Sequence, residues 1–388
     1  MSAARRLVIA GGGPAALAAA RGYRDTGGDG DVVLVTPELS VPYRRPPLSK
    51  DYLRGALDES ELPIEPEAWY AEHDVEVRLG DAAARLDPET RTVALAGGGL
   101  LRYDACVLAT GAAPARLPVA GAEHRRIRVL RSLAEARALR ERAETAERAV
   151  VVGSGFIGCE AAASLSMRGV AVTLVSDEDI PHATRLGEEA GRRIQGWLEE
   201  HRVQLELGHG VDAIERGVTV RTPATTLPDA DLVLMASGVT PRGDLAAAAG
   251  LATHAGRIVV DERMRTSADG VLAAGDVAWA RNAAAGRHLA VEHWGDALAM
   301  GEVAGRTAAG ADATWAEAPG FWSTIGTRTL KYAAWGDGYD EARFAQRPAG
   351  GWSVWYGRDG VTVGVLAHDA DEDYEHGREL VESGAPLP

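Results

Sequence analysis

The feature that most constrains this chain is a glycine-rich turn between a short apolar run and an alanine-rich segment. The apolar run is Leu7–Ala10, and the turn reads Gly11-Gly12-Gly13-Pro14-Ala15-Ala16. A second apolar run, Val32–Val35, follows, and Glu38 lies just beyond it. This order is typical of a dinucleotide-binding unit, in which the turn approaches a pyrophosphate and the acid binds a ribose. Packing alone can also select glycine, but the context on both sides of the turn favours a dinucleotide.

A second unit of the same kind starts 142 positions later, at Gly153. The apolar run Ala149–Val152 precedes the turn Gly153-Ser154-Gly155-Phe156-Ile157-Gly158, and Val170–Val175 follows the helical segment. A repeat on this scale predicts two nucleotide-binding domains and not one decorated domain. Strand-like runs elsewhere, such as Val75–Leu79 and Thr92–Leu95, add to an α/β fold class.

Composition limits the possible functions. The chain has 388 residues, 46% of them hydrophobic and without a long apolar stretch, which is typical of a soluble protein of two or three domains. A net charge of −15 argues against nucleic acid as a partner. The apolar run after Arg5 and Arg6 is cut short by glycines, so we expect no targeting segment. Two cysteines without a CxxC pair favour a cytoplasmic, reducing location. No two of the ten histidines have metal-ligand spacing, so we expect no metal site.

Lysine is rare in this chain, and its position is informative. Only Lys50 and Lys331 are lysines, although the chain has 41 basic residues. Lys50 ends a proline-rich loop, residues 42–50, that cannot form a regular helix. Because a compact ammonium is not interchangeable with a guanidinium, Lys50 is a candidate for its own chemistry.

Several motifs are recognisable together. Besides the two glycine turns, they are Ala109-Thr110-Gly111, Gly275-Asp276-Val277 and the loop Arg45-Pro46-Pro47-Leu48-Ser49-Lys50. Together they resemble the FAD-dependent pyridine nucleotide–disulfide oxidoreductase superfamily, and within it the ferredoxin reductases of the putidaredoxin reductase type. The resemblance covers essentially the whole chain and includes Glu292-His293-Trp294 and Phe321-Trp322-Ser323. It implies that electrons pass from NADH through FAD to a [2Fe-2S] ferredoxin that serves an oxygenase or a cytochrome P450.

The resemblance also implies the domain organisation. It is an α/β fold with two Rossmann-like domains of the glutathione reductase kind and a small C-terminal α+β domain. The implied ranges are 1–112 with 245–317 for FAD, 113–244 for NAD(H) and 318–388 for the C-terminal domain. Near its end, Arg358-Asp359-Gly360 predicts a hairpin turn.

Site residues follow from the resemblance, position by position. For FAD they are Gly11, Gly13, Pro14, Ala15, Ala16, Glu38, Arg44, Pro47, Lys50, Ala82, Ala109, Thr110, Gly111, Arg131, Gly275, Asp276, Glu292, His293, Trp294 and Trp322. For NADH they are Gly153, Gly155, Phe156, Ile157, Gly158, Glu160, Asp177, Arg185, Ser237 and Gly238. Lys50, near the flavin N5, and Glu160, near the nicotinamide amide, are the expected catalytic residues. The alternative for Lys50 is an ion pair, perhaps with Glu160, that only orders its loop.

The chain departs from the family pattern in ways that bear on function. Ser176 replaces the acidic residue expected at the end of the second-domain strand, so Asp177 is assigned the ribose role. The loop at Pro42 and Tyr43 has no cysteine, which excludes the disulfide reductase and peroxidase branches, and Cys106 and Cys159 are expected to be buried. Electrons must then leave the flavin directly.

Two alternative functions and the docking surface stay open at this stage. The flavoprotein could have a binding or signalling role like apoptosis-inducing factor, or it could act on a small molecule. For an acidic ferredoxin, Arg328 and Lys331 beside Trp322 are the expected docking cations. The C-terminal domain is short for the family, which leaves this docking surface open.

The acidic strand end predicts the choice of nicotinamide nucleotide. A 2′-phosphate needs cationic partners, yet Ser176, Asp177 and Glu178 place acid there. We expect kcat/KM to favour NADH over NADPH by about tenfold or more. Steady-state kinetics with both nucleotides measure this ratio, and an equal or reversed preference would contradict the assignment and point to Arg185.

Overall fold

The first layer of the molecule is a parallel sheet built from the apolar runs around the first glycine turn. The computed structural model describes residues 6–348 and 350–388. Five parallel strands form the sheet in the order β19-β7-β1-β2-β3. Their bounds are β1 (Arg6–Ala10), β2 (Asp31–Thr36), β3 (Val75–Leu79), β7 (Ala105–Leu108) and β19 (Val271–Ala273). The continuous apolar runs suit strands that are covered on both faces.

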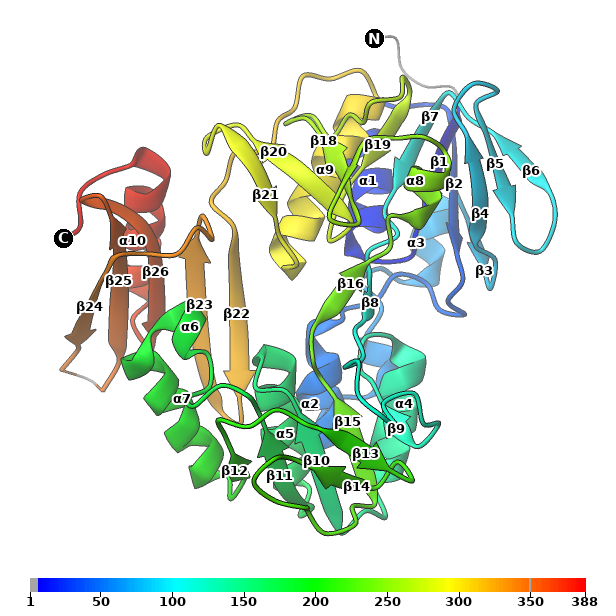
Figure 1. Ribbon diagram of the computed structural model, residues 1–388. Helices are drawn as coiled ribbons and strands as arrows, with labels where there is room; N and C mark the ends of the chain where they lie inside the picture. The colour runs from blue at the N-terminus through cyan, green and yellow to red at the C-terminus, as the bar shows by residue number, and fades with distance from the viewer. Residues whose placement is uncertain (1–5, 349) are drawn as a thin grey trace.

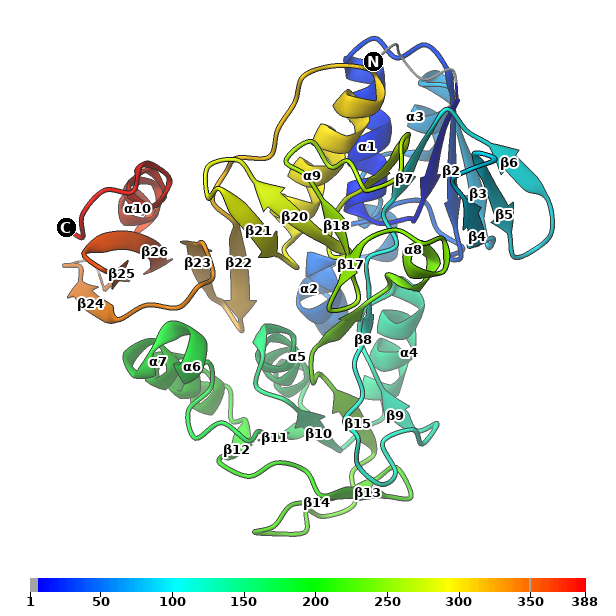
Figure 2. The same cartoon turned by 45° about the horizontal axis from the view of Figure 1, so that its top comes forward.

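Helices α1 (Pro14–Asp25) and α9 (Trp294–Ala308) cross closely beside this sheet, as both views show (Figures 1 and 2). Glycines make the approach possible. A Cβ atom at Gly301 would lie 2.3 Å from the Ala15 carbonyl oxygen, and one at Gly305 would lie 2.1 Å from that of Ala19. The C-terminal part of the chain is therefore packed directly on the first helix, and α9 begins at the end of α1 that follows the glycine turn.

The second sheet repeats this arrangement. Its five parallel strands follow the order β12-β11-β10-β15-β9. They are β9 (Ile127–Arg128), β10 (Arg148–Val152), β11 (Ala171–Val175), β12 (Gln204–Glu206) and β15 (Leu232–Met235). Helix α5 (Phe156–Met167) packs on β10 and β11. Helix α4 (Leu133–Ala143) starts at a capping box formed by Ser132 and Glu135. The charge-rich composition of residues 133–148 predicts a helix over this whole range, but α4 ends at Ala143 and Arg148 already begins β10.

Short elements connect and cover these sheets. A pair of antiparallel strands, β8 (Ala112–Pro114) and β16 (Val239–Pro241), crosses between the first and second sheets (Figure 1). The other small sheets are β4 (Ala83–Asp87), β5 (Thr92–Leu95) and β6 (Leu100–Arg102); β13 (Ala213–Glu215) and β14 (Thr219–Arg221); and β17 (Thr253–His254), β18 (Arg257–Val260), β20 (Ala278–Asn282) and β21 (Arg287–Ala290). The remaining helices before the C-terminal sheet are α2 (Asp51–Arg54), α3 (Glu67–Glu72), α6 (Ala183–Leu186), α7 (Glu188–Glu200) and α8 (Asp244–Ala248), with 3-10 turns η1 (Pro46–Ser49) and η2 (Glu59–Glu61).

The C-terminal part forms an antiparallel sheet in the order β22-β23-β26-β25-β24, with helix α10 (Asp371–Ser383) packed on it. The strands are β22 (Gly320–Ile325), β23 (Arg328–Ala334), β24 (Glu341–Gln346), β25 (Trp352–Arg358) and β26 (Val361–His368). Asp359 and Gly360, both with positive φ, turn β25 into β26 as predicted. The sheet stands beside the other two, with β22 nearest to them (Figure 1).

The predicted fold class is confirmed: two Rossmann-like parallel sheets and a small C-terminal α+β part. Within the described residues, no helix is long and apolar enough to span a membrane. The same residues contain no cluster of three or more histidine, cysteine or acidic side chains suited to a metal ion.

The α1–α9 crossing can be tested by adding one methyl group. Gly305→Ala places a Cβ against the Ala19 carbonyl oxygen, so the helices must separate, at a cost of about 1–3 kcal/mol in the free energy of unfolding. Gly196→Ala in α7 is the matched control, because nothing lies within 4 Å of its added Cβ. That change should stabilise the protein by about 0.5–1 kcal/mol. Equal effects of the two changes in chemical denaturation would show that the close crossing is not required.

Candidate functional site

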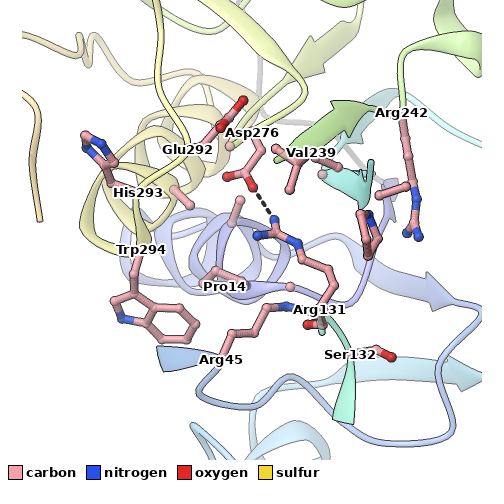
Figure 3. A pocket seen from close by; sticks show the side chains of 18 of the residues that line it. Pro14, Arg45, Arg131, Ser132, Val239, Arg242, Asp276, Glu292, His293 and Trp294 are labelled. Atoms are coloured by element: carbon pink, nitrogen blue, oxygen red, sulfur yellow. Dashed lines mark hydrogen bonds and ion pairs between the residues drawn. The ribbon is translucent and has the colours of Figure 1, made fainter. Parts of the chain in front are cut away.

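One large cavity brings the two glycine turns together. Its volume is about 1430 Å³, larger than the roughly 300–1,000 Å³ of common ligand pockets. Its lining comes from both parallel sheets, the β8–β16 connection, α9 and the C-terminal strand β22. Figure 3 shows part of this lining, with Trp294 and His293 at one end, Arg242 at the other, and Pro14 and Arg45 between them. The cavity therefore has room for two extended ligands that meet.

The first glycine turn has one position that is open to a ligand. Gly11 has φ +143°, and a Cβ there would lie 2.1 Å from the Ala109 carbonyl oxygen. A Cβ at Gly12 would lie 2.3 Å from the Thr36 hydroxyl oxygen. At Gly13 the nearest side-chain atoms, those of Arg45, are 4.0 Å away. Gly13 is also the N-cap of α1, where unpaired N–H groups and the helix dipole favour a phosphate.

The second turn is built in the same way. Gly153 has φ +107°, and its Cβ would lie 2.5 Å from the Ala236 carbonyl oxygen. A Cβ at Gly158 would lie 2.0 Å from the Gly153 carbonyl oxygen. Nothing lies within 4 Å of a Cβ at Gly155, which caps α5. Each turn thus combines glycines required by packing with one open glycine at a helix N-terminus, and this fits the binding of two dinucleotide diphosphates.

Glu38 lies at the rim of the cavity and has two partners. Its carboxylate accepts a hydrogen bond of 2.5 Å from the Tyr43 hydroxyl and forms a 2.5 Å ion pair with Arg45. Burial raises the pKa of Tyr43 well above its usual range, so this hydroxyl stays a donor. Arg45 also donates to the Arg131 carbonyl oxygen at 2.8 Å. Glu38, which follows β2, is therefore held against the proline-rich loop by Tyr43 and Arg45.

The assignment of Arg44 and Pro47 to the cavity needs correction. Arg44 is exposed and donates to the Glu61 carbonyl oxygen, and neither Arg44 nor Pro47 lines the cavity. Arg45 and Pro46 line it in their place. Arg44 lies against the segment around Leu62, whose carbonyl oxygen accepts from the Arg44 backbone N–H at 2.8 Å. A polar loop without a fixed period gave the sequence no signal for choosing between the two arginines.

Lys50 and Glu160 form a buried ion pair. Lys50 Nζ lies 2.6 Å from Glu160 Oε2, and the two residues are 8% and 3% exposed. The same carboxylate oxygen accepts from the Ser49 hydroxyl at 2.5 Å, and Oε1 accepts from the Ser323 hydroxyl at 2.7 Å. Both oxygens of Glu160 are thus satisfied, as a buried carboxylate requires. Lys50 and Glu160 both line the cavity.

A second ion pair, Arg131 with Asp276, crosses the cavity wall (Figure 3). Arg257 donates to the Asp276 carbonyl oxygen and pairs with Glu292.

Most of the predicted site residues line the cavity. They are Gly11, Gly13, Pro14, Ala15, Glu38, Lys50, Ala82, Ala109, Thr110, Gly111, Arg131, Gly155, Phe156, Ile157, Glu160, Arg185, Gly238, Gly275, Asp276, Glu292, His293, Trp294 and Trp322. Those that do not are Ala16, Arg44, Pro47, Gly153, Gly158, Asp177 and Ser237.

The acid that reaches the second glycine turn is Glu178. Its Oε2 atom accepts from the Ser154 hydroxyl at 2.9 Å and from the His182 backbone N–H at 3.1 Å. Ser154 also contacts Ser176, with 2.7 Å between the hydroxyl oxygens. Asp177 is exposed, and neither Asp177 nor Glu178 lines the cavity. The acid that contacts the turn thus lies two positions beyond Ser176, and the run Ser176-Asp177-Glu178 is the sequence signal that could have identified it.

Aromatic rings and one arginine close the junction between the second sheet and the C-terminal sheet. The Arg185 guanidinium lies 5.3–5.9 Å from the ring centres of Phe156, Phe321 and Tyr332. His182 stacks on Phe156 with 4.0 Å between ring centres. Burial, with a smaller contribution from Arg185, lowers the pKa of His182 to about 3, so its imidazole is neutral.

The cysteines lie away from the cavity. Cys106 on β7 and Cys159 on α5 are free, fully buried and outside the cavity lining. Burial raises the pKa of the Cys106 thiol to about 12 and raises that of Cys159 as well. A thiol that stays protonated is a poor nucleophile, so the described cavity has no sulfur chemistry of its own.

The expected docking cations are already paired. Arg328 lies 2.6 Å from Glu200, and Lys331 lies 2.8 Å from Asp371. Only Lys331 is a cross-strand neighbour of Trp322, since Arg328 pairs with Ile325 at the far end of the β22–β23 hairpin. Trp322 is 45% exposed. The structure therefore places Lys331, but not Arg328, directly beside Trp322, and both cations have a carboxylate partner.

Comparisons with known proteins agree with this geometry. The family model described as pyridine nucleotide-disulphide oxidoreductase matches residues 5–301. Rhodocoxin reductase of Rhodococcus erythropolis is 37% identical over 276 residues, or 70% of this chain. The match covers 64% of rhodocoxin reductase, which is less than two thirds of its length. The 5,5'-dehydrodivanillate O-demethylase ferredoxin reductase subunit of Sphingobium sp. (strain NBRC 103272 / SYK-6) is 32% identical over 97% of this chain and 93% of its own length.

A solved structure is similar over nearly the full length. It is a chain in the crystal structure of the covalent putidaredoxin reductase–putidaredoxin complex, with a TM-score of 0.93 and 28% identity over 98% of this chain and 94% of that chain. The resemblance to ferredoxin reductases of this type is confirmed, and with it the predicted cofactors, FAD and NAD(H). By its family match, its relatives and its two nucleotide-binding sheets, this chain belongs to the pyridine nucleotide-disulphide oxidoreductase family.

Proposed function

We propose that this chain is an FAD-dependent reductase that carries electrons from NADH to a [2Fe-2S] ferredoxin serving an oxygenase or a cytochrome P450. The observation that carries this proposal is the single cavity that joins both glycine turns, contains the Lys50–Glu160 pair and has no cysteine in its described lining. Relatives named as ferredoxin reductase components of oxygenase systems support the choice of acceptor.

Bound FAD would supply the redox chemistry, accepting two electrons from NADH and returning them one at a time. The open backbone at Gly13 would receive its diphosphate, with Arg45 beside it. Glu38 and Asp276 offer carboxylate oxygens to its hydroxyl groups. Gly155 would receive the NADH diphosphate, and Glu178 the ribose next to the adenine. Phe156 and Arg185 lie between this turn and His293, where the two ligands meet.

The domain boundaries and the place of the ferredoxin contact complete the proposal. We assign residues 1–112 with 245–317 to the FAD domain, 113–244 to the NAD(H) domain and 318–388 to the C-terminal domain. Trp322 is the exposed aromatic side chain that connects the cavity with the surface, so we assign the ferredoxin contact to its surroundings. The two unpaired, buried thiols support a cytoplasmic location.

Reoxidation after reduction by NADH tests the proposed acceptor. The FAD-loaded protein is reduced anaerobically with NADH and mixed in a stopped-flow instrument with a ferredoxin, a quinone or oxygen. We expect ferredoxin to reoxidise the protein fastest. Faster reoxidation by the quinone would favour an enzyme that acts on a small molecule. Slow reoxidation by all three would favour a binding or signalling role like that of apoptosis-inducing factor.

Glu178 can be separated from Asp177 as the ribose-binding residue. Glu178→Gln weakens the acceptor that reaches the glycine turn, so KM for NADH should rise by about tenfold or more. Asp177→Asn removes the same charge from an exposed neighbour and should change KM by less than about twofold. If Asp177→Asn has the larger effect, the original assignment of Asp177 is restored.

Lys50 lies where an ammonium can stabilise negative charge that develops during reduction. Lys50→Met keeps the length of the side chain and removes its charge, so the flavin potential should fall and reduction by NADH should slow by about 10- to 100-fold. Lys331→Met is the natural control, because Lys331 is the other lysine of the chain and pairs with Asp371 outside the cavity. It should leave both values at those of the wild type.

A double variant distinguishes chemistry from scaffolding. Lys50→Met alone leaves the Glu160 carboxylate buried beside two hydroxyls without its cation, which costs about 3–5 kcal/mol of stability. Lys50→Met with Glu160→Gln removes both charges and should recover stability, measured by thermal unfolding, but not the rate. If the double variant recovers the rate as well, Lys50 only orders its loop.

A further inference from the structure

His293 lies at the end of the cavity where the two proposed ligands meet. It is the N-cap of α9 and lines the cavity beside Trp294 (Figure 3). Its Nδ1 atom lies 3.1 Å from Asp296 Oδ2, and its Nε2 atom lies 3.3 Å from an Arg185 nitrogen. Asp296 is 6% exposed, so its carboxylate is held against the ring and away from solvent.

These contacts determine which nitrogen of His293 carries the proton. A carboxylate only accepts hydrogen bonds, and a guanidinium only donates them. Asp296 therefore selects Nδ1–H, and Arg185 selects the lone pair on Nε2. Asp296 Oδ2 also accepts from the Gly320 backbone N–H at 3.2 Å, which keeps the carboxylate in place. Asp296 and Arg185 thus select the same tautomer, in which the proton is on Nδ1 and the lone pair of Nε2 faces Arg185.

Four other bases of the cavity lining already have partners. Glu160 accepts from one ammonium and two hydroxyls, and Glu38 accepts from Arg45 and Tyr43. Asp276 pairs with Arg131. The second histidine of the described lining, His182, is stacked on Phe156 and its Nε2 lies 4.0 Å from Cys159 Sγ. Burial holds that histidine neutral. His293 differs because a carboxylate behind its ring can stabilise the imidazolium.

The proposed function requires such a base. One NADH and two oxidised ferredoxins give NAD⁺, two reduced ferredoxins and one proton, because hydride carries two electrons and a proton and ferredoxin takes electrons only. We propose that His293, positioned by Asp296, accepts this proton at Nε2 and carries it out of the cavity. The charged groups that contact His293 are Asp296 on its own helix and Arg185 from α6, and its chain neighbour Glu292 pairs with Arg257. At its present distance Arg185 opposes protonation, so it must move away from Nε2 first.

The tautomer is the first test, and it does not depend on turnover. Histidine ¹⁵N shifts of the FAD-loaded protein, with the His293 signals assigned from His293→Gln, should show the Nδ1–H form. In Asp296→Asn that preference should weaken, because an amide can either accept or donate. An Nε2–H form in the wild type, or an unchanged tautomer in Asp296→Asn, would overturn the positioning role of Asp296.

The second test compares the two half-reactions. Asp296→Asn should slow reoxidation of the NADH-reduced protein by about tenfold, clearly more than it slows reduction by NADH, because only reoxidation releases the proton. The solvent deuterium isotope effect on reoxidation should rise. Asp373→Asn is the matched control, since Asp373 is also the third residue of a helix and pairs with Arg347 away from the cavity. It should change neither half-reaction.

This inference depends on the proposed function, but its failure can be recognised separately. Ferricyanide also takes single electrons without a proton, so it replaces ferredoxin as the oxidant in a parallel series. If the wild type reduces ferricyanide but no ferredoxin, the proposed acceptor is wrong while the role of His293 is still measured. If Asp296→Asn slows both half-reactions equally, or neither of them, His293 and Asp296 are structural and the proton leaves by another route.

Discussion

The buried ion pair between Lys50 and Glu160 connects the parts of the molecule that form the cavity. Lys50 ends the loop that follows the first glycine unit, Glu160 lies on the helix of the second unit, and Ser323 reaches the same carboxylate from the C-terminal sheet. A buried pair is tolerated only when its remaining hydrogen-bonding capacity is satisfied, and here two hydroxyls and the Pro46 carbonyl oxygen complete it. The requirement to satisfy one carboxylate therefore fixes how three sheets meet around the proposed cofactors.

Direct electron transfer follows from what surrounds the cavity. Its described lining contains carboxylates, cations and aromatic rings but no thiol, and both cysteines are buried in strands or helices with raised pKa values. Trp294 at the start of α9 and Trp322 on β22 both belong to this lining. The cavity is thus organised to hold and orient two nucleotides next to an exposed aromatic side chain, which suits a partner that receives electrons at the surface.

Much of this could be predicted from the sequence because local rules determine it. The glycine turns were identified from spacing, and the structure shows the reason: Gly11, Gly153 and Gly158 have no room for a Cβ, and Gly13 and Gly155 face open space. The interactions that were missed depend on longer-range geometry. Arg44 is held by the carbonyl oxygens of Glu61 and Leu62, so that Arg45 faces the cavity, and Glu178 reaches back to the Ser154 hydroxyl, 24 positions away.

The partners of the expected docking cations could not be predicted either. Glu200 and Asp371 are far from Arg328 and Lys331 in sequence, so net charge and local composition could not reveal these two ion pairs. The contact of Asp296 with His293 had a local signal, a three-residue spacing at a helix start, but that spacing is also ordinary helix capping. Only the cavity and Arg185 on the other side of the ring distinguish the two meanings.

The stoichiometry of electron delivery tests the central claim most directly. In an anaerobic titration, NADH is added in small portions to a catalytic amount of the FAD-loaded protein with excess oxidised [2Fe-2S] ferredoxin, and the iron–sulfur absorbance is followed. The account predicts two ferredoxins reduced for each NADH, and the same result after both cysteines are replaced by serine or alanine in a folded variant. No reduction of ferredoxin, or reduction that requires a cysteine, would contradict direct transfer from the flavin site.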